Sequence, residues 1–162
     1  MKRQYEIKEE IDAKAKKELE SFGKLTAQLL YNRNIKTKNE AEGFLNPDFS
    51  KLFDPFLLPD MQKAVDRILE AIDKDDRIGI WSDYDADGIP GGALLYDFFK
   101  KIGFKNFTNY IPDRHNEGYG LNLLGIEELK NDGVKLLITI DCGIRNIDEV
   151  NFAKENGMEV IV

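Results

Sequence analysis

The chain has 162 residues, 42% of them hydrophobic and 33% charged, which predicts one globular domain or one domain with a small appendage. Its formal net charge of −7 argues against a wholly basic nucleic-acid-binding surface, although a local patch or bound cations could still attract phosphate. The single cysteine, Cys142, excludes an internal disulfide. No apolar run approaches the roughly 20 residues that span a bilayer, and the amino terminus lacks an apolar signal core. We therefore expect a cytoplasmic protein with no membrane contact.

Residues 1–46 form the first predicted region, a small helical appendage. Ser21 is a candidate cap for the helix that follows it, and the stretch TKNE at 37–40 has the form of a capping box. The segment 46–60 then carries three prolines among apolar residues, which predicts an extended loop pressed against a core.

Residues 47–162 form the second predicted region, in which helices and strands alternate regularly after that loop. Helices are predicted near 61–73, 90–102, 123–131 and 147–156, and strands at 78–82, 107–111, 136–140 and in the final run MEVIV. Strands rich in Ile, Leu and Val that alternate with amphipathic helices predict an α/β fold with a mainly parallel sheet flanked by helices.

Acidic residues follow two of these strands. Asp83, Asp85 and Asp87 come directly after the strand at 78–82, and Asp141 follows the strand at 136–140. Ligands of parallel α/β sheets gather beyond the carboxyl ends of the strands, so both sets should face the same edge. Crowded carboxylates at one edge predict a site for hard divalent cations, whose charge would offset the repulsion.

Other interpretations of the acidic stretch explain it less well. A calcium EF-hand loop would need a glutamate at its twelfth position, which is Leu94 here, and a helix before it. A haloacid-dehalogenase-like phosphatase motif is approximated by Asp85 to Ile89, but it leaves Asp83 unexplained. A polar turn that caps the next helix accounts for one aspartate and not for three. For Asp141 alone, a polar strand end is as good an explanation as a metal ligand.

The loop at 111–122 holds weaker candidates. Arg114 could bind a phosphate through its planar guanidinium, and Gly118 and Gly120 could let main-chain amides approach one. Spacing alone favours a simpler interpretation, a glycine-rich turn with a salt-bridged arginine. His115 is by default a surface residue, and Cys142 a small packed one.

Four stretches occur in an order and spacing that resemble the amino-terminal part of the RecJ-type exonucleases of the DHH phosphoesterase family. They are FLNPDFSKLFDPFLLPDMQKAVDRI, SDYDADGIPGGAL, YIPDRHNEGYGLN and LLITIDCGI. The resemblance implies a DHH-type amino-terminal domain of a nuclease that uses two cations, Mn²⁺ or Mg²⁺, to hydrolyse single-stranded DNA from its 5′ end. It also implies a role in DNA repair and recombination, with a single-strand-binding protein or a helicase as candidate partners.

Site residues follow from the resemblance position by position. Asp85 and Asp87 match metal ligands with Asp83 beside them, and Asp141 matches the next ligand, so these four form the implied catalytic set. The implied substrate loop contains Glu117 in its turn, and its candidate contact residues are Arg114, His115, Gly118, Tyr119 and Gly120. Ile89 and Pro90 depart from the family, which usually has a threonine or serine after the glycine.

The motif that names the family, Asp-His-His, is expected just after Val162. The chain is therefore expected to be an inactive fragment of a larger exonuclease. Two alternatives stay open: a DHH-type phosphodiesterase acting on short oligonucleotides or cyclic dinucleotides, and a non-catalytic scaffold that keeps the fold.

Overall fold

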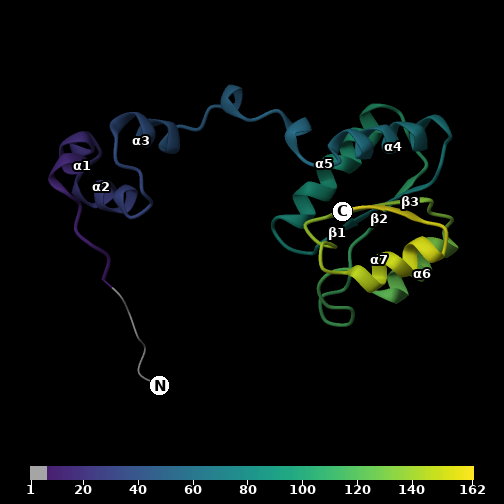
Figure 1. The fold of residues 1–162 in the computed structure, drawn as a ribbon. Coiled ribbons are helices and arrows are strands. Elements are labelled where there is room, and N and C mark those ends of the chain that lie inside the picture. Colours follow the sequence, from purple (N-terminus) through teal and green to yellow (C-terminus); the bar gives the residue numbers. More distant parts are fainter. Residues whose placement is uncertain (1–6) are drawn as a thin grey trace, which may run out of the picture. The chain divides into compact units, whose positions relative to one another are not determined.

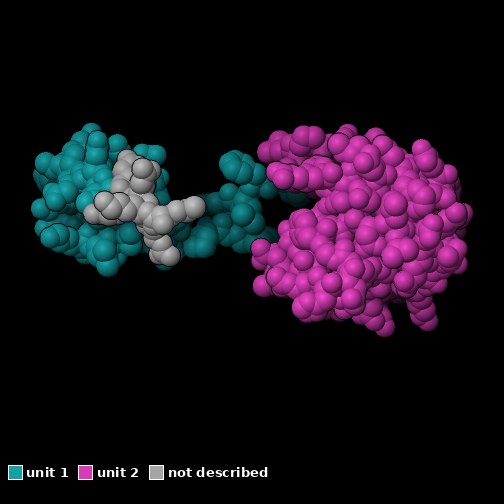
Figure 2. All heavy atoms as spheres, turned by 90° about the horizontal axis from the view of Figure 1, so that it is seen from below, with its two compact units in different colours: residues 1–55 teal, residues 56–162 magenta. Residues whose placement is uncertain are grey.

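The structure, a computed structural model, describes residues 7–162. The chain divides into two compact units, residues 1–55 and residues 56–162, which Figure 2 shows in different colours. No helix in the described part of the chain is long and apolar enough to cross a membrane.

The first unit contains a small helical bundle (Figure 1). Its α-helices are α1 (Ala13–Glu18), α2 (Lys24–Tyr31) and α3 (Lys38–Leu45), with a 3₁₀ turn, η1, at Glu20–Phe22. The buried side chains at its centre come from all three helices or the residues between them: Ala15, Leu19, Ala27, Leu30 and Ala41. This small core explains why three short helices, each marginal by itself, are held together.

Helix caps in this unit test two local predictions. The Thr37 hydroxyl accepts a hydrogen bond from the Glu40 N–H, and the Glu40 carboxylate accepts one from the Thr37 N–H, so the predicted capping box is confirmed. The predicted cap at Ser21 is wrong. Ser21 lies inside η1, and α2 begins instead after Gly23, whose φ of +78° suits a residue without a side chain.

The segment 46–60 differs from its prediction. It contains two short 3₁₀ turns, η2 (Phe49–Lys51) and η3 (Pro55–Leu57), and every residue in it is exposed. Phe49 and Phe53 keep 88% and 87% of their surface accessible. The expected packing of this segment against a core stays a prediction. Prolines fix φ and so favour short turns of this kind.

The second unit is a three-layer α/β domain with a parallel sheet, which confirms the predicted fold class (Figure 1). Its strands are β1 (Ile78–Ser82), β2 (Phe107–Tyr110), β3 (Leu136–Ile140) and β4 (Glu159–Ile161), in the order β2-β1-β3-β4. Its helices are α4 (Met61–Asp73), α5 (Gly88–Lys101), α6 (Leu123–Asn131) and α7 (Ile147–Glu155). Helices α4 and α5 cover one face of the sheet, and α6 and α7 cover the other.

Successive side chains of each strand point to opposite faces of the sheet, so a separate core forms on each face. Ile78 and Ile80 of β1 belong to a buried cluster with Ala71 of α4 and Phe99 of α5. Trp81, the next residue of β1, belongs to a second cluster whose members come mainly from the α6 and α7 side: Leu121, Ile126, Leu129, Val134, Leu137, Ala153 and Met158. Burial on both faces explains why these strands are apolar throughout.

Candidate metal centre

The candidate centre lies where the strand order of the sheet reverses. From β1 the chain crosses to β2 on one side, whereas β3 and β4 lie on the other side, so β1 and β3 are neighbours at a switch point. In open parallel sheets, the crevice beyond the carboxyl ends of two such strands is the usual ligand site. Asp83 follows β1 directly and Asp141 follows β3 directly. The topology therefore brings together the two acidic stretches that the sequence separates.

Three carboxylates converge at this point. Asp83, Asp85 and Asp141 each offer an oxygen, and these oxygens all lie within 4.8 Å of one another. Asp87 is not in this group: it precedes α5 as the N-cap residue without a capping hydrogen bond from its side chain. Its assignment as a metal ligand stays a prediction.

Asp83 is the buried member of the group. Only 2% of its surface is accessible, and its Oδ1 atom is buried without a hydrogen-bond partner within the described chain. A buried carboxylate oxygen without a partner is costly to desolvate, and a bound cation would remove that cost. This oxygen is the observation that best fits a metal ion to the site.

The Asp85 carboxylate is held by main-chain hydrogen bonds at the start of α5. Its Oδ1 accepts hydrogen bonds from the main-chain N–H groups of Asp87 and Gly88, at 2.9 and 3.1 Å, and so holds the turn into α5. These two bonds, with a smaller contribution from the positive charge of Arg114, lower the pKa of the Asp85 carboxyl. Asp85 is therefore held in the ionised form that ligates a cation.

Asp141 has a strained backbone and a perturbed carboxyl. Its φ of +59° lies in the left-handed region, which is uncommon for a residue with a side chain and recurs at functional sites. Partial desolvation, followed by the negative charges of Asp85 and Asp87, raises the pKa of the Asp141 carboxyl. Mutual repulsion of this kind is what a divalent cation relieves.

Glycines allow the first turn of α5 to approach the strand ends. A Cβ atom on Gly88 would lie 2.4 Å from the carbonyl oxygen of Asp83, and one on Gly92 would lie 2.1 Å from the Ser82 hydroxyl oxygen. The helix begins at Gly88, two residues before the predicted start, so Pro90 is its third residue and not its first. Proline is still tolerated there because main-chain N–H groups of the first turn lack helical partners.

The loop at 111–122 reaches the carboxylate group through Tyr119 and Arg114. The Tyr119 hydroxyl donates a 3.0 Å hydrogen bond to the main-chain oxygen of Asp141. The Arg114 guanidinium lies over the ring of Tyr84, 5.0 Å from its centroid, and its charge acts on Asp85. A guanidinium beside these carboxylates is suited to hold a phosphate oxygen.

The two predicted glycines of this loop adopt left-handed conformations, with φ of +79° at Gly118 and +89° at Gly120. At Gly120 a side chain would also collide with Asn146, whose amide exchanges hydrogen bonds with the main chain of Leu121. His115 is exposed, and its main-chain N–H donates to Asp113. The glycines therefore shape the loop, and their contact with substrate stays a prediction.

Glu117 anchors the loop in a way that spacing could not reveal. Its carboxylate accepts hydrogen bonds from the Tyr110 hydroxyl, from the Asp113 N–H at 2.6 Å and from the Asn122 side chain at 3.0 Å. The Tyr110 ring stacks on Trp81, with centroids 4.3 Å apart. Through these contacts, the loop is attached to the core under the sheet.

Cys142, next to Asp141, is half-buried, and burial raises the pKa of its thiol to about 11. A thiol with so high a pKa carries little thiolate at neutral pH and is a poor nucleophile.

Fold and carboxylate geometry together define an α/β domain with an acidic group at a topological switch point that could hold a divalent cation. Residues 77–162 match the description "DHH family, N-terminal domain". The chain belongs to the DHH family.

Two similar proteins are single-stranded-DNA-specific exonucleases. The chain is 38% identical to the single-stranded-DNA-specific exonuclease RecJ of Bacillus subtilis (strain 168) over 85% of this chain and 17% of that protein. It is 33% identical to RecJ of Haemophilus influenzae over 85% of this chain and 23% of that one. The chain thus spans less than a quarter of these two relatives, and the resemblance to RecJ is confirmed over that part.

Solved structures agree with the fold. A crystal structure of exonuclease RecJ bound to manganese matches 65% of this chain with a TM-score of 0.59 and 38% identity, over 28% of its own chain. RecJ from Thermus thermophilus in complex with Mn²⁺ matches 93% of this chain with a TM-score of 0.65 and 28% identity, over 20% of its own chain. Both structures contain manganese, a metal that suits a carboxylate site.

Proposed function

We propose that the chain supplies part of the catalytic centre of a metal-dependent exonuclease specific for single-stranded DNA. The observation that carries this proposal is the convergence of Asp83, Asp85 and Asp141 at a switch point, in a chain similar to RecJ exonucleases. A phosphodiesterase of short oligonucleotides or cyclic dinucleotides, and a non-catalytic scaffold, are less favoured because the two similar RecJ proteins are exonucleases.

Asp83, Asp85 and Asp141 would hold a Mn²⁺ or Mg²⁺ ion, with Asp87 as a further candidate ligand for a second one. When bound, such ions supply charge for the scissile phosphate and lower the pKa of a bound water. Arg114 would bind a phosphate oxygen, and Tyr119 would keep the loop against Asp141. Gly118 and Gly120 would allow main-chain N–H groups to approach the single-stranded DNA. His115 would lie on the exposed side of the same loop.

Finer features belong to the proposal as well. They are 5′-to-3′ polarity, a role in DNA repair and recombination, a cytoplasmic location, and action beside a single-strand-binding protein or a helicase. The preference between Mn²⁺ and Mg²⁺ is an outcome of the experiment below.

The test uses the full-length protein that carries this chain and measures degradation of 5′-ended single-stranded DNA with each metal. Asp141→Asn keeps the size of the side chain and removes its charge, so turnover should fall by at least about a hundredfold. Asp73→Asn is the matched control, because Asp73 is exposed at the end of α4, near the amino ends of the strands.

Three results would contradict the proposal. Full activity of the Asp141→Asn enzyme would remove Asp141 from the centre. Preferential cleavage of cyclic dinucleotides would favour the phosphodiesterase. Absence of hydrolysis by the unmodified protein with either metal would favour the scaffold.

A further inference from the structure

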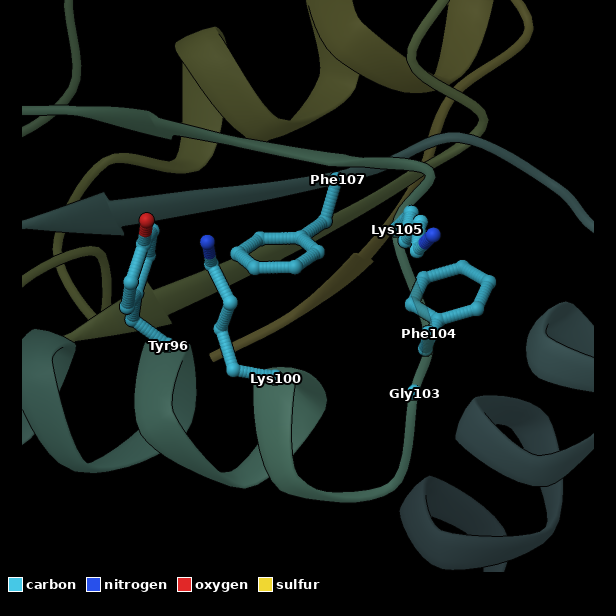
Figure 3. Close-up of a pocket in the computed structure, with 6 residues that line it drawn as sticks. All are labelled: Tyr96, Lys100, Gly103, Phe104, Lys105 and Phe107. Carbon is cyan, nitrogen blue, oxygen red and sulfur yellow. The ribbon is translucent and has the colours of Figure 1, made fainter.

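A groove lies at the end of the domain opposite to the carboxylates. It encloses about 390 Å³, within the range of ligand sites, and Figure 3 shows its lining. It is formed by the end of α5, the turn after it and the start of β2: Tyr96, Lys100, Gly103, Phe104, Lys105 and Phe107. β2 is an edge strand, so the groove opens at the side of the sheet.

Aromatic rings form the inner surface of the groove. Phe107 packs against Phe99 and Phe104, with centroid distances of 5.2 and 6.3 Å, so its ring is held by the core. Tyr96 meets Phe107 edge to face at 5.2 Å and keeps 37% of its surface accessible. A rigid ring wall with one accessible aromatic side chain is a suitable platform for a planar group.

Lysines flank this wall. Lys100 extends over the Tyr96 ring, with its Nζ 5.3 Å from the centroid, and Lys105 lies on the other side of Phe107 (Figure 3). Both lysines are exposed. Residues 96–107 carry three lysines and one aspartate, Asp97, in a chain whose net charge is −7. A helix end attracts lysines in general, but Lys105 lies beyond the helix and is not explained in that way.

The groove is separate from the metal centre. Phe107 pairs with Ile78 at the start of β1, whereas the carboxylates follow its end, so the two sites are about 16 Å apart along the strands. Helix α5 begins at the carboxylates and ends at the groove.

We propose that this groove binds one nucleotide of single-stranded DNA, with the base against Tyr96 and Phe107 and the flanking phosphates at Lys100 and Lys105. An aromatic wall between two ammonium groups matches a base between two phosphates. Stacking on aromatic rings combined with basic side chains is how proteins hold single strands without reading their sequence. The choice of DNA as ligand rests on the proposed function, whereas the groove and its charge do not.

The experiment measures fluorescence anisotropy of a labelled oligothymidylate of about 12 nucleotides with this chain, in EDTA and at several salt concentrations. EDTA removes catalysis, so the result is independent of nuclease activity. The double variant Lys100→Gln and Lys105→Gln should bind at least about fivefold more weakly. The slope of the logarithm of the binding constant against the logarithm of the salt concentration should become smaller in magnitude by about 1.4, or about 0.7 per lost phosphate contact. Tyr96→Leu should weaken binding at least about fivefold, through lost stacking, with the slope unchanged.

Lys154→Gln is the matched control, because Lys154 is an exposed lysine in the last turn of α7, as Lys100 is in α5. It should bind like the unmodified chain, and an oligomer of equal length without bases should bind more weakly. The inference is overturned if the unmodified chain does not bind, or if the control loses as much affinity as the double variant. It is also overturned if the abasic oligomer or a duplex binds as tightly as the oligothymidylate. Loss of nuclease activity in the full-length Asp141→Asn protein, with unchanged oligonucleotide binding by this chain carrying the same substitution, would support both proposals separately.

Discussion

The hydroxyl of Tyr119 donates a 3.0 Å hydrogen bond to the main-chain oxygen of Asp141, 22 residues further along the chain. Tyr119 is otherwise 65% exposed, so this bond and not burial fixes its ring. Its acceptor is a residue with a left-handed backbone and a carboxylate in the candidate metal group. The position of the loop is therefore coupled to the carboxyl end of β3.

Tyr119→Phe should separate loop placement from metal binding. A net hydrogen bond contributes about 0.5–1.5 kcal/mol, so kcat/KM of the full-length protein on single-stranded DNA should fall about two- to tenfold. Mn²⁺ affinity should stay within about twofold, because the lost bond ends on the main chain and not on a carboxylate. Steady-state kinetics and calorimetric Mn²⁺ titration check the two parts. A large loss of Mn²⁺ affinity, or unchanged kinetics, would contradict this assignment.

Asp83→Asn should stabilise the metal-free chain and remove its response to metal. The variant relieves repulsion from Asp85 and Asp141 and replaces a buried anionic oxygen that has no partner with a neutral group. We expect its melting temperature in EDTA to rise by a few degrees, which corresponds to roughly 1 kcal/mol.

Saturating Mn²⁺, at about 100 times its Kd, should add about 2.7 kcal/mol to the stability of the unmodified chain and much less to that of the variant. Fluorescence of Trp81, the single tryptophan, reports the melting of the second unit. A variant that melts earlier in EDTA would indicate a structural role for the charge.

Alanine at Gly88 and at Gly92 should destabilise the domain for different reasons. The new Cβ at position 88 would meet a main-chain oxygen, whereas at position 92 it would meet the Ser82 hydroxyl. Both single variants should lose about 2 kcal/mol or more. Adding Ser82→Ala to the Gly92→Ala variant should restore part of the lost stability. Adding it to the Gly88→Ala variant should restore none. Urea denaturation of the four variants checks this. Gly43→Ala is the control, since a Cβ there meets nothing within 4 Å, and it should stabilise α3 by up to about 1 kcal/mol.

The sheet can be predicted from sequence because each of its strands is a short apolar run between clear helix signals. The strand at 78–82, the strand at 136–140 and the helices at 61–73 and 123–131 have their predicted bounds. The predicted start of α5 is too late. The main-chain N–H groups of Asp87 and Gly88 donate hydrogen bonds to the Asp85 side chain, and these bonds set the helix start, whereas proline alone does not. The segment 46–60, predicted as an extended loop, contains two 3₁₀ turns, since prolines favour turns as readily as extended backbone.

The candidate site is predictable only at the level of strand ends. Placing Asp83 and Asp141 at one edge needs no more than two parallel strands. Which carboxylates converge depends on side-chain direction after the strand, and so the grouping of Asp83 with Asp85 and Asp141, without Asp87, could not be read from spacing. The bond from Tyr119 to Asp141 likewise joins two loops whose approach depends on the whole domain.

Glu117→Gln should weaken the domain in a pH-dependent way. Burial by itself would raise the pKa of the Glu117 carboxyl, but the hydrogen bonds from Tyr110, Asp113 and Asn122 outweigh burial and lower it below 4.5. Because the folded-state pKa is the lower one, the ionised network stabilises the fold fully above about pH 4.5. That stabilisation is lost as the pH falls through the folded-state value. At pH 7 the variant should therefore be less stable by about 1 kcal/mol, and the difference should shrink below about pH 4.

Urea denaturation at pH 7 and at about pH 3.5 measures this difference, and Trp81 fluorescence reports it directly because the indole stacks on Tyr110. Glu127→Gln is the matched control, because Glu127 is exposed on α6 and its loss should change stability by less than about 0.5 kcal/mol at either pH. Tyr110→Phe should reproduce part of the effect of Glu117→Gln, since it removes one of the three donors. If the losses of unfolding free energy from Glu117→Gln and Tyr110→Phe simply added in the double variant, the carboxylate and the hydroxyl would act independently. The proposed anchoring of the loop through their hydrogen bond would then be wrong.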